Sequence, residues 1–157
     1  MAEHGFDHHD HNHCISTGLE VAEKHCADAG VRLTPVRRRV LEILLQEHRA
    51  MGAYDILPIL AQEGLGSQPP VVYRALEFLQ ANKLVHKVER LNAFIACSHP
   101  GSDHVPAFMI CRDCSKVVET QGSTAAGLTA AAQDVGFSVE ATVIEAEGLC
   151  PNCQPSA

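Results

Sequence analysis

The 157-residue sequence predicts an α+β protein in two parts, and three observations support this fold class. Apolar residues recur at helical spacing through the first half, and two short apolar stretches around a polar turn follow them. The second half carries two Cys-x-x-Cys pairs, Cys111/Cys114 and Cys150/Cys153, within a pattern of strands and one helix. We therefore expect a helical unit ending in a β-hairpin, then a small α/β unit closed by a metal ion.

The composition limits the class of protein. No run approaches the ~18 apolar residues of a membrane span, and the N-terminus lacks a basic-then-apolar leader, so no membrane association is expected. Seven cysteines in such a chain favour a reducing cytoplasm and thiolate–metal chemistry over a disulfide framework. The net charge is −7, yet ten of the twelve Lys and Arg residues fall between residues 15 and 91. That uneven distribution is the weak footprint of a DNA-binding unit joined to an acidic one.

Residues 1–14 have no apolar period and are predicted to form a disordered tail. The tail contains five histidines and ends in Cys14. Two interpretations remain open: loose metal binding, or a solvated segment of no fixed role.

Four helices are expected next. Leu19, Ala22 and Cys26 share one helical face, and Gly30 ends that helix. Thr34-Pro35 is an N-cap followed by proline at the first position of a second helix, whose early arginines, 37–39, are interpreted as a solvated face.

The third helix runs from Tyr54 to about Gln62, and Pro58 inside it should kink or shorten it. Pro69-Pro70 opens the fourth, where apolar residues face inward and Arg74 points outward. Leu84–Val88 and Ala93–Cys97 then form a hairpin. Helices followed by a hairpin are the winged-helix plan, in which the last helix enters the major groove of DNA.

The second half is predicted to contain strands at Ala107–Ile110 and Lys116–Thr120, a helix of small residues at Ser123–Val135, and a long strand at Phe137–Ala146. An α/β unit of this size leaves one sheet exposed, which suits dimerisation.

The Cys-x-x-Cys pairs predict a structural zinc site. Each pair sits in a tight turn, so two sulfurs from each can converge on one tetrahedral ion at about 2.3 Å. The rival interpretation is a pair of redox dithiols. It normally requires one pair at the start of a helix in a βαβ unit, and neither pair has that context.

Six segments together resemble the ferric uptake regulator family, most closely its zinc uptake regulator branch. They occur in the family's order over nearly the whole chain: Val31–Arg37, Ala53–Leu57, Pro69–Leu76, Leu84–Glu89, Cys111–Cys114 and Val143–Cys150. The resemblance implies a dimeric, metal-responsive transcription regulator. It implies a winged-helix DNA-binding domain at 15–91, a hinge at 92–98 and a dimerisation domain at 99–157. It also implies DNA contacts from Tyr54, Tyr73 and Arg74, with Arg74 able to bind guanine through two hydrogen bonds.

The resemblance further implies a second, regulatory metal site at the hinge, from His86, Cys97, His104 and Glu119, and so about two zinc ions per protomer. A thiolate among two imidazoles and a carboxylate favours Zn²⁺ over iron. The loop that follows Cys97 offers two histidines, and spacing alone leaves His99 open as the alternative to His104.

The leading hypothesis is a cytoplasmic, zinc-dependent repressor of zinc-uptake genes, acting as a homodimer on palindromic operator DNA. The alternatives are an iron- or peroxide-responsive regulator of the same family and a zinc-storage protein that uses the tail. An enzyme is not expected: four protein ligands leave no open position for water, and no nucleophile set, carboxylate pair or phosphate loop indicates a small organic substrate.

Overall fold

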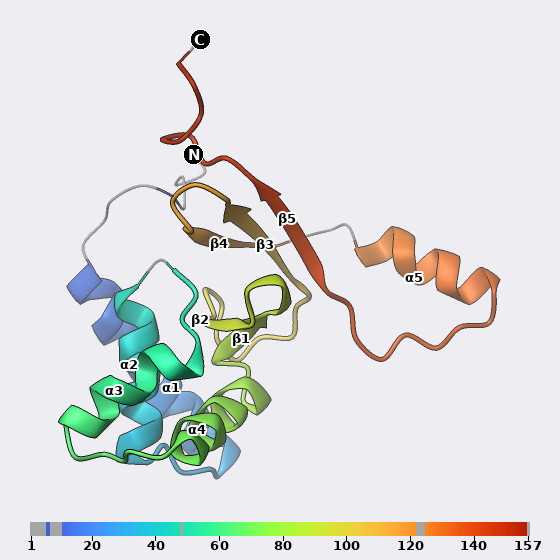
Figure 1. Ribbon diagram of the computed structural model, residues 1–157. Coiled ribbons are helices and arrows are strands. Elements are labelled where there is room, and N and C mark those ends of the chain that lie inside the picture. Colours follow the sequence, from blue (N-terminus) through green and yellow to red (C-terminus); the bar gives the residue numbers. More distant parts are fainter. Residues whose placement is uncertain (1–5, 7–10, 48, 122–124, 157) are drawn as a thin grey trace.

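Four helices form the N-terminal half because their apolar faces meet in one core (Figure 1). They are α1 (His11–Ala29), α2 (Pro35–Gln46), α3 (Ala53–Gln62) and α4 (Pro69–Ala81). The computed structural model describes residues 6, 11–47, 49–121 and 125–156. Within these residues, no helix combines the length and apolar character needed to cross a membrane.

The helix ends follow the predicted chemistry. Thr34 caps α2, accepting a hydrogen bond from the backbone N–H of Arg37 at 3.4 Å, and Pro35 takes the first helical position. Pro58 lies inside α3, which still runs as one helix to Gln62. The arginines at 37–39 are engaged rather than merely solvated: the guanidinium of Arg39, for example, binds Glu63 through two hydrogen bonds at 2.7 and 2.8 Å.

The hairpin follows α4 and belongs to the N-terminal half. Strands β1 (Val85–Val88) and β2 (Ala93–Ala96) pair antiparallel, and the 3-10 turn η1 (Glu89–Leu91) forms the tip. Residues 93–96 of the predicted hinge are therefore a wing strand, and the chain leaves the hairpin only at Cys97.

A second sheet forms the C-terminal half. Its order is β4 (Val117–Gln121), β3 (Pro106–Cys111), β5 (Ile144–Gly148), with β4 antiparallel and β5 parallel to β3. Helix α5 (Ala125–Asp134) projects away from this sheet (Figure 1).

A small apolar cluster joins the two halves. Val88 and Ile95 of the hairpin pack with three residues of the C-terminal sheet, Phe108, Ile110 and Val117, and all five are buried. A backbone bridge between Arg49 and Lys116 adds a further tie. The hairpin thus lies between the helical core and the second sheet.

Two expectations were wrong. Helix α1 begins at His11, so residues 11–14 are helical rather than part of a disordered tail; Ile15 packs against the core, which favours an extra turn before it. The rest of that predicted tail, apart from Phe6, lies outside the described residues. The long strand at Phe137–Ala146 is also shorter than expected: β5 starts at Ile144, whose partner is Ala107 near the start of β3, and in the described part of the chain no strand pairs with the residues before it.

Candidate metal centres and nucleic-acid interface

Four cysteine sulfurs meet at one end of the C-terminal sheet. Cys111 ends β3 and pairs in register with Gly148 of the parallel strand β5, so the turn after each strand lies at the same edge. The sulfurs of Cys111, Cys114, Cys150 and Cys153 all lie within 4.8 Å of one another. Those of Cys114 and Cys150 are 3.7 Å apart. Tetrahedral zinc with Zn–S bonds of about 2.3 Å requires about 3.8 Å between sulfurs, so these four residues fit the ion.

Backbone N–H groups favour the thiolate form of one cysteine in this cluster, which is the form that binds a cation. Hydrogen bonds from the backbone N–H groups of Cys114 and Cys150 lower the pKa of the Cys111 thiol to about 6, which favours its thiolate form. The N–H of Cys150 lies 3.4 Å from that sulfur. Contact with the other sulfurs, that of Cys150 first, raises the pKa of Cys153 to about 12. Thiols this close can all ionise only when a cation is among them.

A second cluster lies between the two halves. His86 comes from β1, Cys97 from the residue after β2, His104 from the loop before β3, and Glu119 from β4. One ligand atom from each lies within 4.8 Å of the others. Nε2 of His104 lies 3.6 Å from the sulfur of Cys97, close to the spacing of about 3.6 Å that a tetrahedral zinc with one S and one N ligand requires. The Glu119 side chain is only 2% exposed, so this carboxylate is buried against its partners.

A nitrogen without a partner indicates that a cation belongs in this cluster. Nε2 of His86 is buried and finds no hydrogen-bond partner among the residues that the structure describes, although it lies 3.2 Å from the Glu119 carboxylate, and a buried unpaired nitrogen is costly. Nδ1 of His104 lies 3.0 Å from the carbonyl of Ser102 and 3.1 Å from the Ser102 hydroxyl, while Nε2 faces Oε1 of Glu119 at 2.6 Å. These contacts turn Nε2 of the ring toward the buried carboxylate.

The electrostatics of the cluster differ between its acid and its thiol. Burial alone would raise the pKa of Glu119, but contact with His86, the N–H of Ser98 and the ring of His104 outweighs it and lowers that pKa to about 2. Burial, with the charge of Glu119 added, raises the pKa of Cys97 to about 12. The carboxylate is therefore ionised in advance, and the thiol gives up its proton when a cation binds.

The structure separates the two histidines that spacing left open. His104 lies within the cluster. The His99 side chain is not part of it: its Nδ1 is 3.0 Å from the Ser98 hydroxyl, and only the His99 backbone N–H reaches the cluster, donating to the Cys97 sulfur at 3.3 Å.

Two of the three predicted DNA contacts, Tyr54 and Tyr73, share one surface. Tyr54 at the start of α3 is 69% exposed and Tyr73 of α4 is 40% exposed, and both line a cavity of about 280 Å³ with Lys87 of the hairpin. Arg74 is exposed, and among the described residues it makes no ion pair, unlike the arginines at 38 and 39. Lys87 was not singled out from the sequence, because a single lysine in a strand gives no periodic signal.

Comparison with known proteins places the chain in a family. Residues 28–146 match the ferric uptake regulator family. The chain is 41% identical over 138 residues to the zinc uptake regulation protein of Escherichia coli (strain K12), covering 86% of this chain and 80% of the relative. It is 30% identical over 139 residues to the peroxide operon regulator of Bacillus subtilis (strain 168), covering 86% and 92%.

Solved structures show the same fold. A zinc uptake regulator complexed with zinc and DNA matches with a TM-score of 0.84 at 38% identity, covering 88% of this chain and 94% of that one. The holo form of XcZur matches with a TM-score of 0.81 at 38% identity, covering 87% and 96%. The apo form of XcZur matches with a TM-score of only 0.51, at 39% identity and coverage of 89% and 97%. Because the two forms are almost equally identical to this chain in sequence, their TM-scores differ because their conformations differ. On this evidence, the chain belongs to the ferric uptake regulator family.

Proposed function

We propose that this protein is a zinc-responsive transcriptional repressor of zinc-uptake genes that binds operator DNA as a homodimer. The observation that carries the proposal is the second cluster, whose ligands come from both halves of the chain. His86 and Cys97 belong to the hairpin of the helical half, and His104 and Glu119 to the C-terminal half. A cation bound there would favour one relative placement of the halves, because only that placement brings all four ligands together.

Zinc is the cation that the ligands favour. His86, Cys97, His104 and Glu119 would hold it, and a set of two imidazoles, a thiolate and a carboxylate suits Zn²⁺ better than iron. Hydrogen bonds already orient the ligands: the carbonyl and hydroxyl of Ser102 lie 3.0 and 3.1 Å from Nδ1 of His104, and the N–H of Ser98 donates to Glu119 at 2.8 Å. The relatives support the same metal, since the regulator with the TM-score of 0.84 to this chain was solved with zinc and DNA.

The helical half provides the DNA-reading surface. Recognition helix α4 carries Arg74 outward, and Tyr54, Tyr73 and Lys87 surround the neighbouring cavity. We assign Arg74 to a base edge and the two tyrosines to phosphates or thymine methyl groups. In a two-fold dimer, two such helices would meet a palindromic site.

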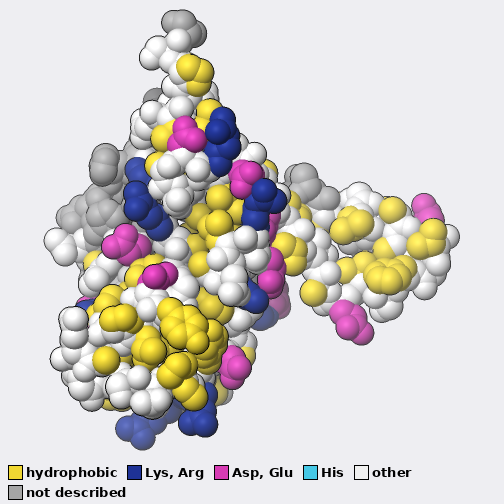
Figure 2. Space-filling view, viewed as in Figure 1, with side chains coloured by type: hydrophobic (Ala, Val, Ile, Leu, Met, Phe, Trp, Pro, Cys, Tyr) yellow, Lys and Arg dark blue, Asp and Glu magenta, His cyan; other side chains and the backbone are white. Residues whose placement is uncertain are grey.

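The C-terminal half provides a dimer surface. Apolar side chains are exposed along α5 and the segment after it, including Leu128 (55%), Val135 (78%) and Phe137 (67%). Figure 2 shows hydrophobic side chains gathered on this projecting arm. Exposed apolar groups of this density are normally covered by a partner, and a second copy provides a symmetric one.

Two further parts belong to the proposal. The protein is not an enzyme, because both clusters use four protein ligands and leave no position for a substrate or water. It works in the cytoplasm, where DNA is available and thiolate ligands remain reduced.

The test is capture and sequencing of fragmented genomic DNA on the full-length protein with free zinc buffered high and then low. Enrichment of a few palindromic sites only at high zinc is expected. Enrichment of the same sites at high and at low zinc would overturn the proposal that DNA binding responds to zinc. Enrichment that follows ferrous iron or peroxide instead would favour an iron- or peroxide-responsive regulator. No enrichment in any condition would favour zinc storage, which predicts that deletion of residues 1–14 removes much of the bound zinc.

A further inference from the structure

The tip of the hairpin is held by two carboxylates of the C-terminal half. The carboxylate of Glu145 on β5 accepts hydrogen bonds from two backbone N–H groups of η1, those of Glu89 at 2.6 Å and Arg90 at 3.0 Å. Glu147, two residues further along β5, accepts two from the Arg90 guanidinium, at 2.8 and 3.0 Å. Bidentate pairs of this kind fix geometry as well as charge.

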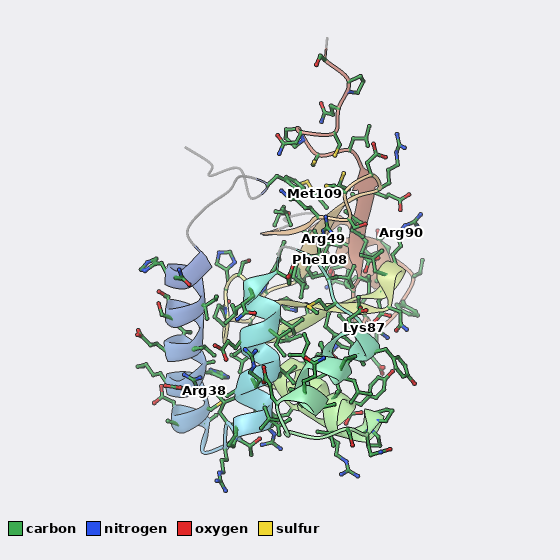
Figure 3. All side chains as sticks on the ribbon, turned by 60° about the vertical axis from the view of Figure 1, so that its left-hand side comes forward. Arg38, Arg49, Lys87, Arg90, Phe108 and Met109 are labelled. Carbon is green, nitrogen blue, oxygen red and sulfur yellow. The ribbon has the colours of Figure 1, made fainter. Side chains whose placement is uncertain are left out.

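The sheet register explains why both acids face the hairpin. Glu145 pairs with Phe108 and Glu147 with Ile110 across the parallel β3–β5 ladder, so each acid shares a sheet face with its partner. Phe108 and Ile110 point into the buried cluster that contains Val88, the residue just before η1. Figure 3 shows Arg90 beside the strand β5.

The hairpin is therefore held at both ends by the C-terminal half. His86 and the residue after β2, Cys97, lie at its open end within the metal cluster, whereas η1 forms its closed end. The contacts at the tip involve carboxylates, backbone N–H groups and a guanidinium, none of which needs a metal ion.

We propose that Glu145 and Glu147 are positioning residues that clamp the hairpin tip and set the zinc concentration at which DNA binding begins. This inference rests on the proposed function of the hinge cluster. In a two-state protein, apparent metal affinity is the intrinsic affinity reduced by the fraction already in the binding-competent arrangement. The tip clamp raises that fraction without metal, so loosening it raises the zinc requirement by the same factor.

The clamp also assigns Arg90 a role other than DNA binding. A basic residue at a wing tip would ordinarily be taken for a phosphate contact. Here its guanidinium is occupied by Glu147, and its backbone N–H by Glu145. The two roles make opposite predictions for Glu147, because removing a carboxylate beside a phosphate contact would strengthen DNA binding.

The test measures operator binding by fluorescence anisotropy across a buffered zinc series for Arg90→Gln, Glu147→Gln and the double variant. Each single variant is expected to raise the zinc midpoint about two- to fivefold, the range for a solvent-exposed pair, and the double variant no further. Affinity at saturating zinc should stay unchanged. Asp28→Asn, which breaks the exposed Lys24–Asp28 pair within α1, is the matched control and should leave the midpoint where it is.

Three results would overturn the proposal. One is an unmoved midpoint in both single variants. Another is weaker binding by Arg90→Gln at saturating zinc together with tighter binding by Glu147→Gln, which would make Arg90 a phosphate contact. The third is additive shifts in the double variant, which would show that the two residues do not act on each other.

A second measurement separates this inference from the proposed function. Amide exchange at Glu89 and Arg90 is followed by NMR in the wild-type protein and in Glu145→Ala. Protection in the wild type that is lost in the variant supports the clamp even if DNA binding proves indifferent to zinc. Fast exchange in the wild type would overturn it whatever the zinc response.

Discussion

Truncation of His86 provides a sharp test of the hinge cluster, because the cost of losing this side chain depends on whether a metal is bound. Without metal, the buried Nε2 has no hydrogen-bond partner in the described part of the chain, and the ring makes an edge contact with Phe108 at 5.8 Å between centroids. His86→Ala relieves an unpaired nitrogen worth about 1–3 kcal/mol, and against this it removes the ring contact, worth about 0.5–1.5 kcal/mol, and the contact that lowers the pKa of Glu119. We expect the metal-free midpoint of thermal unfolding to change little.

With zinc, the same substitution should matter much more. Zinc at about 100 times its dissociation constant adds about 2.7 kcal/mol of stability, which for a chain of this size raises the midpoint by about 5–11 °C. Substitution of a residue that only hydrogen-bonds to a metal ligand weakens metal binding about 10–100-fold. Loss of a ligand itself should weaken zinc binding at least as much. If the zinc affinity falls 100-fold, the same zinc concentration adds only about 0.4 kcal/mol of stability, and the unfolding midpoint rises by only about 1–2 °C.

The assay is differential scanning fluorimetry, with and without buffered zinc, of protein that keeps the metal of its four-cysteine cluster. His99→Ala is the matched control, since His99 lies in the same loop region but outside the hinge cluster. It should keep the full zinc-induced rise. A full rise in His86→Ala would remove His86 from the ligand set, and a lost rise in His99→Ala would replace His104 by His99.

Other parts of the structure lead to four more predictions. Cys150→Ser should unfold or monomerise the C-terminal half, because a structural zinc contributes about 10–16 kcal/mol to folding; gel filtration with zinc analysis measures this, and a zinc-loaded dimer would contradict it. Arg74→Ala should lower the preference for operator over mismatched DNA by about 1–3 kcal/mol, measured by competition binding; equal losses on both DNAs would make it a phosphate contact. Phe137→Glu should shift the protein toward monomer in analytical ultracentrifugation with the helical half still folded, and an intact dimer would place the interface elsewhere. Hydrogen bonds from Arg39 lower the pKa of Glu63, so the ionised carboxylate stabilises the folded state above the ordinary glutamate pKa of 4.5. Glu63→Gln should therefore lower the midpoint of thermal unfolding at neutral pH, and the difference from wild type should disappear as the pH falls below 4.5. A difference that persists in acid would show that the charge of Glu63 is not its source.

Local chemistry was enough to predict most of the fold. Helix α4 begins at Pro69, as the Pro-Pro start predicts, and the inward residues of its stripe, Val72, Ala75, Leu76 and Leu79, are all buried. These features depend on residues within one or two helical turns, which the sequence displays directly.

The errors arose where structure depends on distant partners. The apolar alternation before Ile144 resembles a strand, but a strand needs a neighbour, and β3 ends its pairing with β5 at Ala107. The clamp was missed for the same reason. Glu145 and Arg90 are 55 residues apart in sequence, and nothing near either one indicates that their elements meet.

The two clusters show why ligand chemistry alone does not assign a metal's role. Both offer four ligands at spacings that suit zinc. The cysteine cluster is built on β3 and β5, paired neighbours in one sheet, so a metal there closes a single unit. The other takes two ligands from each half, and those halves meet through a small apolar cluster and the contacts at the hairpin tip. A metal stabilises a fold when its ligands move together, and it selects a conformation when they do not. In the proposed function, the division of ligands between the two halves, rather than their identity, is therefore the reason to assign sensing to the hinge cluster.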